Sequence, residues 1–315
     1  MREVDAADWD ALPGLDAYYR HAYVESAAVL EGGRPFLLEH EGALFAGIER
    51  EDPPDVLSPY GYGGPVGGDG DFWAAYEEWC REHGVVSTFV RFHPLYANQR
   101  SAPIHVEQLA PTVGWRLGDG RDLLAGMHWK HRNKVRKAEN AGATVSAAPG
   151  LDGFVPLYEE TMRRVGASDF YLFTSDYWKA LDGLGDALVR FDAAIGGETV
   201  ASALCLASPP WLHYHLSGTT DKGRSTGSST FVLLEAARWA QERGYDRFHL
   251  GGGLGGKQDS LHHFKARFDP GGLLEAAVGK AVHDEDAYRR LSGGAARLDG
   301  FFPAYRASAP SSDAV

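Results

Sequence analysis

The sequence predicts an α/β (α+β) protein of two similar domains, each a mixed sheet with flanking helices. Two stretches, 36–49 and 188–207, alternate apolar and polar residues around a glycine-containing turn, which is typical of β-hairpins. Each is followed by a further strand, a helix and another strand, so one element order occurs twice. The two helices also end alike, in EEWCREHG and ARWAQERG, which aligns Trp79 with Trp239. We interpret this repeat as a duplication.

In the first half, the hairpin FLLEHEGALFAGIE turns at its Glu-Gly pair. The stretch FWAAYEEWCREHG has apolar residues at helical spacing and a glycine, Gly84, where a helix would end. VVSTFVRFHP then predicts a buried strand that ends at Pro94. We expect the first domain to span residues 1–145 and to end in a basic linking helix, 130–141.

In the second half, LVRFDAAIGGETVASALCLA predicts the hairpin and WLHYHLSG the next strand. TFVLLEAARWAQERG predicts a helix that ends at Gly244, and YDRFHLGGG predicts a strand that runs into a glycine cluster. We expect the second domain to span residues 146–302. The remaining tail, 303–315, is small and polar and is expected to be disordered.

The linking helix contains the densest positive charge in an acidic chain. The protein has 31 Lys plus Arg against 43 Asp plus Glu, a formal net charge of -12. Residues 130–141 lack Pro and Gly and are followed by Gly142, which predicts a helix. Such a helix either contacts phosphates or is a solvated linker balanced by acidic residues such as those of 69–82. Its positive side chains are Lys130, Arg132, Lys134, Arg136 and Lys137.

Composition narrows the class of protein. The 315 residues are 44% hydrophobic and 23% charged, as in soluble globular proteins, and contain no apolar run of about 18 residues that could span a membrane. The acidic N-terminus lacks the pattern of a signal peptide, so we expect a cytoplasmic protein. Cys80 and Cys205 are expected to be buried apolar residues without a disulfide.

Common catalytic motifs are missing from the sequence. It contains no GxSxG, no HExxH, no Cys-rich metal spacing and no GxxxxGK[ST]. His213 and His215 would share one face of a strand, which suits metal ligands, but no third ligand is evident nearby. Hydrogen-bonded strand histidines are commoner, so we expect neither a metal nor a cofactor.

Two glycine-rich stretches in the second half suit ligand binding. GRSTGSS lies before a helix, where free N–H groups attract phosphate. Its Arg224, Gly227 and Ser229 approximate the R/Q-x-x-G-x-G/A loop with which acyl-CoA N-acetyltransferases hold a pyrophosphate. LGGGLGGKQDS permits close approach of a ligand to the backbone and precedes a helix that Ser260 would cap. The residues of interest there are Gly251, Gly252, Gly253, Phe264, Lys265 and Arg267.

Two stretches in the first half offer further candidates. SPYGYGGP would present Tyr60 and Tyr62 on rigid turns as aromatic, hydrogen-bonding walls. VRFHP places Arg91 and His93 on one face of a strand, where both can meet an anion. Each pair also has a structural interpretation, namely packing for the tyrosines and a satisfied salt bridge for the arginine.

Taken together, these stretches resemble the Fem-like (FemX/FemAB) branch of the Gcn5-related acyltransferase (GNAT) fold. The matching pieces span most of the chain: SPYGYGGP, VRFHP, HRNKVRKAENAG, LYEETMRRVGASDFYLF, HYHLSG, RGYDRFHLGGG and HHFKARF. The resemblance implies two tandem GNAT-like domains, which would explain the repeat. It also implies aminoacyl-tRNA as donor and an amine on a peptide or peptide-like precursor as acceptor. The long helical arm of staphylococcal Fem proteins is missing, which favours a monomer.

The resemblance also implies roles for particular residues. The family's Phe-Lys pair falls on Phe264 and Lys265, and Lys265 would stabilise the charge of the tetrahedral intermediate or of the departing ribose oxygen. The backbone and ring of Phe264 would help to shape the acceptor site, and the general base is left open. In HYHLSG the implied substrate contacts are Tyr214, His215 and Ser217.

Two other hypotheses stay open at this point. The first is an acyl-CoA-dependent N-acyltransferase that uses the loop at 224–229. The second is a binding module that kept the fold and lost the reaction, in which case Lys265→Ala would change nothing beyond stability. The acceptor amine, on a peptidoglycan precursor or a peptide natural product, is not specified by the sequence.

Overall fold

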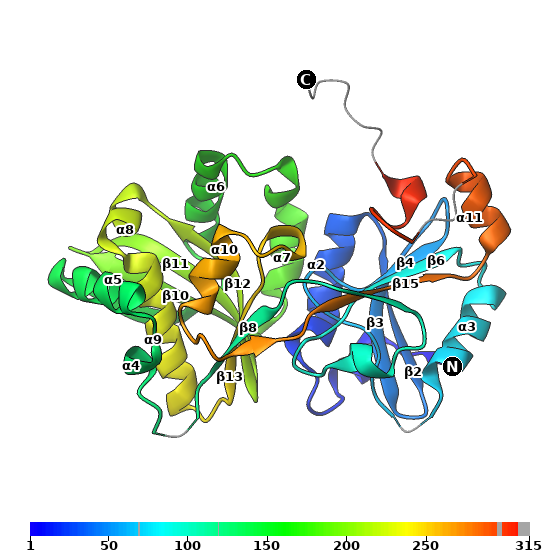
Figure 1. Cartoon of the computed structure of the whole chain (residues 1–315), viewed down its shortest axis with the longest axis horizontal. Coiled ribbons are helices and arrows are strands. Elements are labelled where there is room, and N and C mark those ends of the chain that lie inside the picture. Colours follow the sequence, from blue (N-terminus) through cyan, green and yellow to red (C-terminus); the bar gives the residue numbers. More distant parts are fainter. Residues whose placement is uncertain (69, 119, 295–297, 308–315) are drawn as a thin grey trace. The chain divides into compact units, whose positions relative to one another are not determined.

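The computed structural model of the chain describes residues 1–68, 70–118, 120–294 and 298–307. The chain divides into two compact units, each built on one mixed sheet (Figure 1). The first unit consists of Met1–Pro13, Tyr18–Leu109 and Ala276–Val315, and the second of Gly14–Ala17 and Ala110–Glu275.

The first unit has the strand order β1-β2-β3-β4-β6-β15-β7, with β5 paired to β3. Among the described strands of this sheet, only β4 and β6 form a parallel pair. Aromatic side chains, among them Phe36, Tyr76 and Trp79, fill its core. The strands are β1 (Arg2–Glu3), β2 (Arg34–His40), β3 (Ala43–Arg50), β4 (Asp55–Leu57), β5 (Val66–Gly67), β6 (Ser87–Arg91), β7 (His105–Gln108) and β15 (Ala277–Val282). The helices are α1 (Ala6–Asp10), α2 (His21–Glu31), α3 (Phe72–Glu82) and α11 (Glu285–Leu291).

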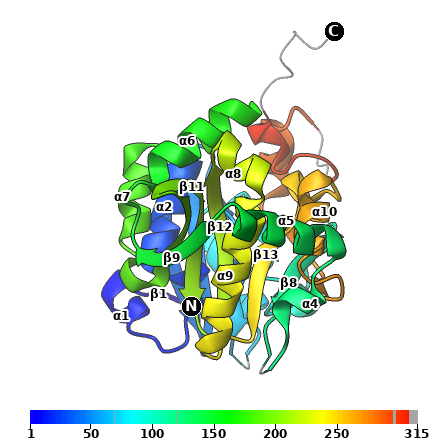
Figure 2. The ribbon, with the colours of Figure 1, turned by 90° about the vertical axis from the view of Figure 1, so that its left-hand side faces the viewer.

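The second unit has the strand order β14-β8-β13-β12-β11-β10-β9, and only β12 and β13 run parallel. Helix α9 lies against the sheet, with α5 beside the end at which α8 joins it (Figure 2). The strands are β8 (Thr112–Arg116), β9 (Ala143–Pro149), β10 (Leu188–Ile195), β11 (Glu198–Ser208), β12 (Trp211–Thr219), β13 (Arg247–Gly251) and β14 (Leu273–Leu274). The helices are α4 (Leu123–Gly126), α5 (Trp129–Asn140), α6 (Phe154–Val165), α7 (Ser175–Asp182), α8 (Asp221–Thr226), α9 (Ser228–Glu242) and α10 (Ser260–Ala266).

The repeated element order is confirmed by the strand topology. The hairpin β2–β3 is followed by β4, the short β5, α3 and β6, and the hairpin β10–β11 by β12, α8, α9 and β13. Both hairpins turn through two residues with positive φ, Glu41-Gly42 and Gly196-Gly197, as tight hairpins require. Each unit then adds an antiparallel strand beside its second parallel strand: β15 beside β6, and β8 beside β13.

These added strands place the division between the units differently from the expected boundary at residue 145. Residues from Ala110 onward belong to the second unit because β8 pairs with β13 and α5 packs against α9. The chain returns to the first unit at Ala276 because β15 pairs with β6 and β7. The sequence alone did not indicate either exchange.

The first residues of the tail, which the sequence predicts to be disordered, contact the first unit. Residues 304–306 form a short 3-10 turn, and the Tyr305 hydroxyl is 2.7 Å from the Ser87 hydroxyl. Arg306 donates to the Asp55 carboxylate at 2.9 Å. The rest of the tail, 308–315, lies outside the described residues.

Within the described part of the chain, none of the helices is both long enough and apolar enough to cross a membrane. Both cysteines are buried and free.

Candidate active site

The two parallel strands of the second unit part after three residue pairs. Trp211, Leu212 and His213 of β12 face residues 247–249 of β13, and no later pair joins the two strands. Strand β12 continues along β11, with His215 bulged out of the register, while β13 continues along β8. The divergence lies in the interior of the sheet, between two strands that each stay paired on the other side.

Lys265 reaches this point of divergence from α10. Its side chain is only 8% exposed, and its Nζ donates to the Gly252 carbonyl at 2.8 Å. The same Nζ lies 5.7 Å from the centre of the Tyr214 ring, the first β12 residue after the paired stretch. Lys265 forms no ion pair with any residue that the structure describes. Burial lowers the pKa of Lys265 to about 8, although the charge of Asp259 works in the opposite direction.

The glycine-rich loop between β13 and α10 is organised by Asp259. Its carboxylate accepts from the amide of His262 at 2.9 Å and from that of Leu254 at 3.0 Å. These bonds lower the pKa of Asp259. Asp259, not Ser260, therefore caps α10, because its two oxygens accept two backbone amides at once. At Gly253 a Cβ would lie 2.1 Å from the Lys257 carbonyl oxygen, so the loop requires glycine there.

The predicted β12 residues lie next to Lys265 but are engaged with one another and with α7. The Tyr214 hydroxyl donates to the Ser217 hydroxyl, and burial raises the pKa of Tyr214 to about 12. His215 Nε2 is 3.0 Å from the Tyr177 hydroxyl. Loss of solvation, with a smaller effect of His213, lowers the pKa of His215 to about 3. Both Tyr214 and His215 are therefore uncharged at neutral pH.

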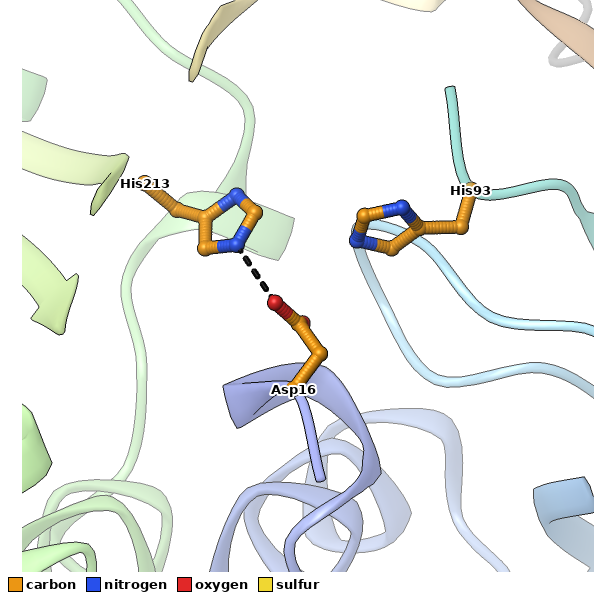
Figure 3. Close-up of side chains that lie close together, drawn as sticks. All are labelled: Asp16, His93 and His213. Atoms are coloured by element: carbon orange, nitrogen blue, oxygen red, sulfur yellow. Dashed lines mark hydrogen bonds and ion pairs between the residues drawn. The ribbon is translucent and has the colours of Figure 1, made fainter. Parts of the chain in front are cut away.

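His213 and His215 do not form the joint ligand pair that their spacing allowed. The bulge at His215 separates their surroundings, and His213 Nε2 donates to the buried carboxylate of Asp16 at 2.7 Å (Figure 3). Asp16 belongs to the short segment Gly14–Ala17 of the second unit. Each of the two histidines has a hydrogen-bond partner in the second unit, Asp16 for His213 and Tyr177 for His215.

Phe264 holds α10 against α5. Its carbonyl accepts a hydrogen bond from His131 Nε2 at 2.9 Å, and its ring packs 5.0 Å from that of His131. Burial, with smaller effects of neighbouring cations, lowers the pKa of His131 to about 4, so its ring is neutral and fixed as a donor to this carbonyl. Lys134 Nζ lies 5.5 Å from the centre of the Phe264 ring. Arg267 caps the C-terminal end of α10. Partial burial, with a smaller effect of the Arg267 charge, lowers the pKa of Lys134.

The predicted basic helix is confirmed as α5, one residue earlier than expected at each end. The side chains of Lys130, Lys134, Arg136 and Lys137 are exposed, and none forms an ion pair with a described residue. Arg132 differs, because its guanidinium turns back to the carbonyls of residues 125 and 127.

The segment that approximated a pyrophosphate loop is helical. Residues 221–226 form α8, capped by Thr220, and Gly227 joins α8 to α9. A Cβ at Gly227 would lie 2.7 Å from the Lys134 carbonyl oxygen, so the backbone of α5 covers this turn. Arg224 is exposed and donates to Asp221 at 3.1 Å, and the Ser229 hydroxyl donates to Thr219. The segment does not form an open cradle.

The four candidates from the first half lie in the first unit. The Tyr62 ring packs edge-on against Tyr18, at 5.4 Å, and against His93, at 5.9 Å. His93 is fully buried. The carbonyl of Tyr60 accepts from the Tyr23 hydroxyl at 2.6 Å. Arg91 is bound to Glu31 at 3.2 Å and to the Ser58 carbonyl at 3.1 Å, which is the salt bridge offered as its structural interpretation.

Three residues that position the site went unrecognised in the sequence. Asp259 had a usable signal, since aspartate immediately before a helix is a preferred cap. His131 and Tyr177 had none, because their partners Phe264 and His215 lie 133 and 38 residues away. Such contacts depend on the packing of helices that no local pattern specifies.

The chain is similar to known proteins in part of its sequence and in its fold. Residues 128–266, from the cap of α5 to the end of α10, match the family model described as acetyltransferase (GNAT) domain. A crystal structure of FemX is similar, with a TM-score of 0.66 and 14% identity over 92% of this chain and 99% of that one. A protein of unknown function from Bacteroides thetaiotaomicron has a TM-score of 0.62 and 13% identity, over 89% of this chain and 98% of that one. L-PGS from Bacillus licheniformis has a TM-score of 0.53 and 15% identity, over 82% of this chain and 87% of that one. No curated protein sequence matches the chain.

The fold is thus the Fem-like arrangement of tandem GNAT-like domains, and the predicted fold class and resemblance are confirmed. The family match places residues 128–266 with acetyltransferase (GNAT) domains, and the similar structures show the fold of the whole chain.

Proposed function

We propose that the protein moves an aminoacyl group from aminoacyl-tRNA to the amine of a peptide or peptide-like precursor, such as a peptidoglycan precursor or a peptide natural product. The supporting observation is the buried ammonium of Lys265, which lies where β12 and β13 part and forms no ion pair with a described residue. A buried charge without a counterion lowers stability, so such groups concentrate where a reaction generates the opposite charge. In acyl transfer that charge is the oxyanion of the tetrahedral intermediate.

The proposed reaction balances without a cofactor. The acceptor nitrogen attacks the carbonyl carbon of the aminoacyl ester, and a C–N bond forms. The bond between that carbon and the ribose oxygen then breaks, and the proton lost by the amine ends on the ribose oxygen. Lys265 is mostly protonated at neutral pH, because its pKa is about 8, so it can stabilise the oxyanion and the departing oxygen. Holding amine and ester together supplies much of the remaining rate, since an ester is already activated.

The donor assignment is supported by α5. Its exposed cations make no ion pairs with described residues, and the helix is fastened to α10 through His131 and Phe264. Positive side chains that lack acidic partners suit the phosphates of a nucleic acid. In this proposal Lys130, Lys134, Arg136 and Lys137 contact the tRNA backbone.

An acyl-CoA donor is the second candidate, and the family match of residues 128–266 favours it. The geometry of the candidate phosphate segment argues against it, because α8 is helical and the Lys134 backbone covers Gly227. An experiment on the donor therefore compares aminoacyl-tRNA with acyl-CoA.

In the test, the purified protein is incubated with radiolabelled aminoacyl-tRNAs and candidate acceptor amines. A parallel reaction contains acyl-CoA as the donor instead. We expect label transfer from tRNA that ribonuclease abolishes. Lys265→Met should lower the rate by about 100-fold or more, as for the loss of one oxyanion donor. The exposed Lys257 of the same loop gives the matched control, and Lys257→Met should keep the rate. Transfer from the thioester alone would establish the CoA donor, and an unchanged rate in Lys265→Met would remove Lys265 from the chemistry.

A further inference from the structure

The first residue of α5 is an exposed tryptophan. Trp129 is 55% exposed, and it is the one tryptophan among the described residues whose side chain is exposed. Tryptophan is a large apolar residue, and leaving its ring in water forgoes a substantial burial free energy. Lys130 Nζ lies 5.5 Å from the centre of the Trp129 ring, and the His128 ring lies 5.7 Å from it. A flat apolar ring is thus combined with positive charge on one exposed surface.

Positive charge continues along α5 from Lys130, on the side next to that of Trp129. Lys130, Lys134 and Lys137 follow at intervals of four and three residues, which places them on one side of α5. The adjacent side of α5 is buried through His131, Val135 and Ala138. This positive surface contrasts with the formal net charge of -12 of the whole chain.

The surface adjoins the helix that bears Lys265. The amide of His128 donates to the Arg267 carbonyl at 2.9 Å, which joins the start of α5 to the end of α10. Six residues further along α5, Lys134 lies over the ring of Phe264, the residue before Lys265. Trp129 and the three lysines therefore form one surface that leads to the candidate active site within the second unit.

We propose that Trp129 is a stacking platform for an unpaired nucleotide of an RNA 3′ end, with Lys130, Lys134 and Lys137 on the adjoining phosphates. Single-stranded nucleic acid is bound by this combination, because bases stack on aromatic rings while cations follow the backbone. More than half of the Trp129 side chain is exposed, which leaves ring surface for a base. The inference rests on the proposed use of aminoacyl-tRNA and adds where on the chain the unpaired end binds.

The test measures the affinity of the full-length protein for a labelled single-stranded RNA oligonucleotide by fluorescence anisotropy. Trp129→Ala should weaken binding about tenfold, since one stacked base contributes on the order of 1–3 kcal/mol. Phe170→Ala removes another exposed aromatic ring of the second unit and should leave the affinity unchanged. Inorganic polyphosphate, which has no bases, should bind Trp129→Ala as well as the native protein. Changing the three lysines to glutamine should weaken the binding of both RNA and polyphosphate. For RNA, the slope of log affinity against log salt concentration should become shallower by about two.

Three outcomes would overturn the inference. The first is an RNA affinity that Trp129→Ala leaves unchanged. The second is an equal loss for polyphosphate, which would assign Trp129 to the support of the lysines. The third is tight binding to phosphatidylglycerol vesicles that Trp129→Ala abolishes, which would make the surface a membrane contact. RNA binding that depends on Trp129 without aminoacyl transfer would leave this inference standing and refute the proposed function. Aminoacyl transfer together with an RNA affinity that Trp129→Ala leaves unchanged would support the proposed function and refute this inference.

Discussion

Lys265 combines deep burial with a charge that the surrounding protein does not neutralise. Among the described residues, its Nζ contacts the Gly252 carbonyl and the Tyr214 ring, which together replace only part of the hydration of an ammonium. The result is a lowered pKa and a folded state that is less stable than it would be with an apolar side chain. Proteins keep such costs mainly where function requires them.

The cost can be measured through the pH dependence of stability. The pKa of Lys265 is about 8 in the folded state against 10.5 for the free side chain, so between these values the unfolded state binds more protons. Stability therefore rises with pH across this window, by about 3 kcal/mol in total for the difference in pKa. Lys265→Met lacks this group and should be more stable than the native protein at pH 7. Its advantage should shrink between pH 8 and pH 10.5 in urea unfolding, and a constant difference would show that Lys265 is not buried as a cation.

The same titration should appear in the reaction. If the ammonium stabilises the oxyanion, the rate falls as pH rises through about 8, because the cation is lost. If Lys265 instead takes the proton of the amine, the rate rises through the same pH. In Lys265→Arg the guanidinium stays charged, so the descending limb should disappear even where the rate is lower. The measurement is the initial transfer rate from pH 6.5 to 9, corrected for the hydrolysis of the ester without enzyme.

At the level of elements, the loop between β13 and α10 fixes where Lys265 lies. Asp259 caps the helix and ties the loop amide of Leu254 to it, while Gly253 passes close to both Lys257 and Asp259. A side chain at Gly253 would displace the cap and, through α10, Lys265. The loop therefore has less tolerance for substitution than its glycine content suggests.

Gly253→Ala should destabilise the protein by about 1–3 kcal/mol, because a Cβ would lie 2.1 Å from the Lys257 carbonyl oxygen and 2.3 Å from Asp259 Oδ1. The matched control is Gly126→Ala in α4, where a Cβ would meet only the tip of Arg121 at 3.9 Å. That variant should change stability by less than about 0.5 kcal/mol. Thermal unfolding of both variants checks the prediction, and equal melting temperatures would show that the loop can move aside.

Local signals explain which elements could be predicted from the sequence. The hairpins were evident because Glu41-Gly42 and Gly196-Gly197 supply the positive φ angles of tight turns. Helix α5 was evident because its sequence lacks breakers and is followed by Gly142. The site could be predicted only in part. Phe264 and Lys265 were found through a family resemblance, whereas the contacts of His131 and Tyr177 join elements that are distant in sequence.

For the whole molecule, the exchange of strands between the two halves of the chain is the feature that the sequence did not indicate. Strand β15 follows the second unit in sequence but lies between β6 and β7 of the first unit's sheet. Its register, with Val278 opposite Arg91 on one side and Glu107 on the other, joins residues that are far apart in the chain. Pairing of this kind closes long loops, and no local propensity encodes it.

The interior position of β15 predicts how the first unit unfolds. Val278→Pro removes a backbone donor from a strand that is paired on both sides, which should cost about 3 kcal/mol or more. Glu3→Pro places the same residue in β1, an edge strand of the same sheet, and should cost much less. Hydrogen exchange should show protection lost in β6, β7 and their neighbours for Val278→Pro. The strands β10, β11 and β12 should stay protected, since they belong to a unit with its own core. Loss of protection in both units at once would mean that they unfold as a single cooperative body.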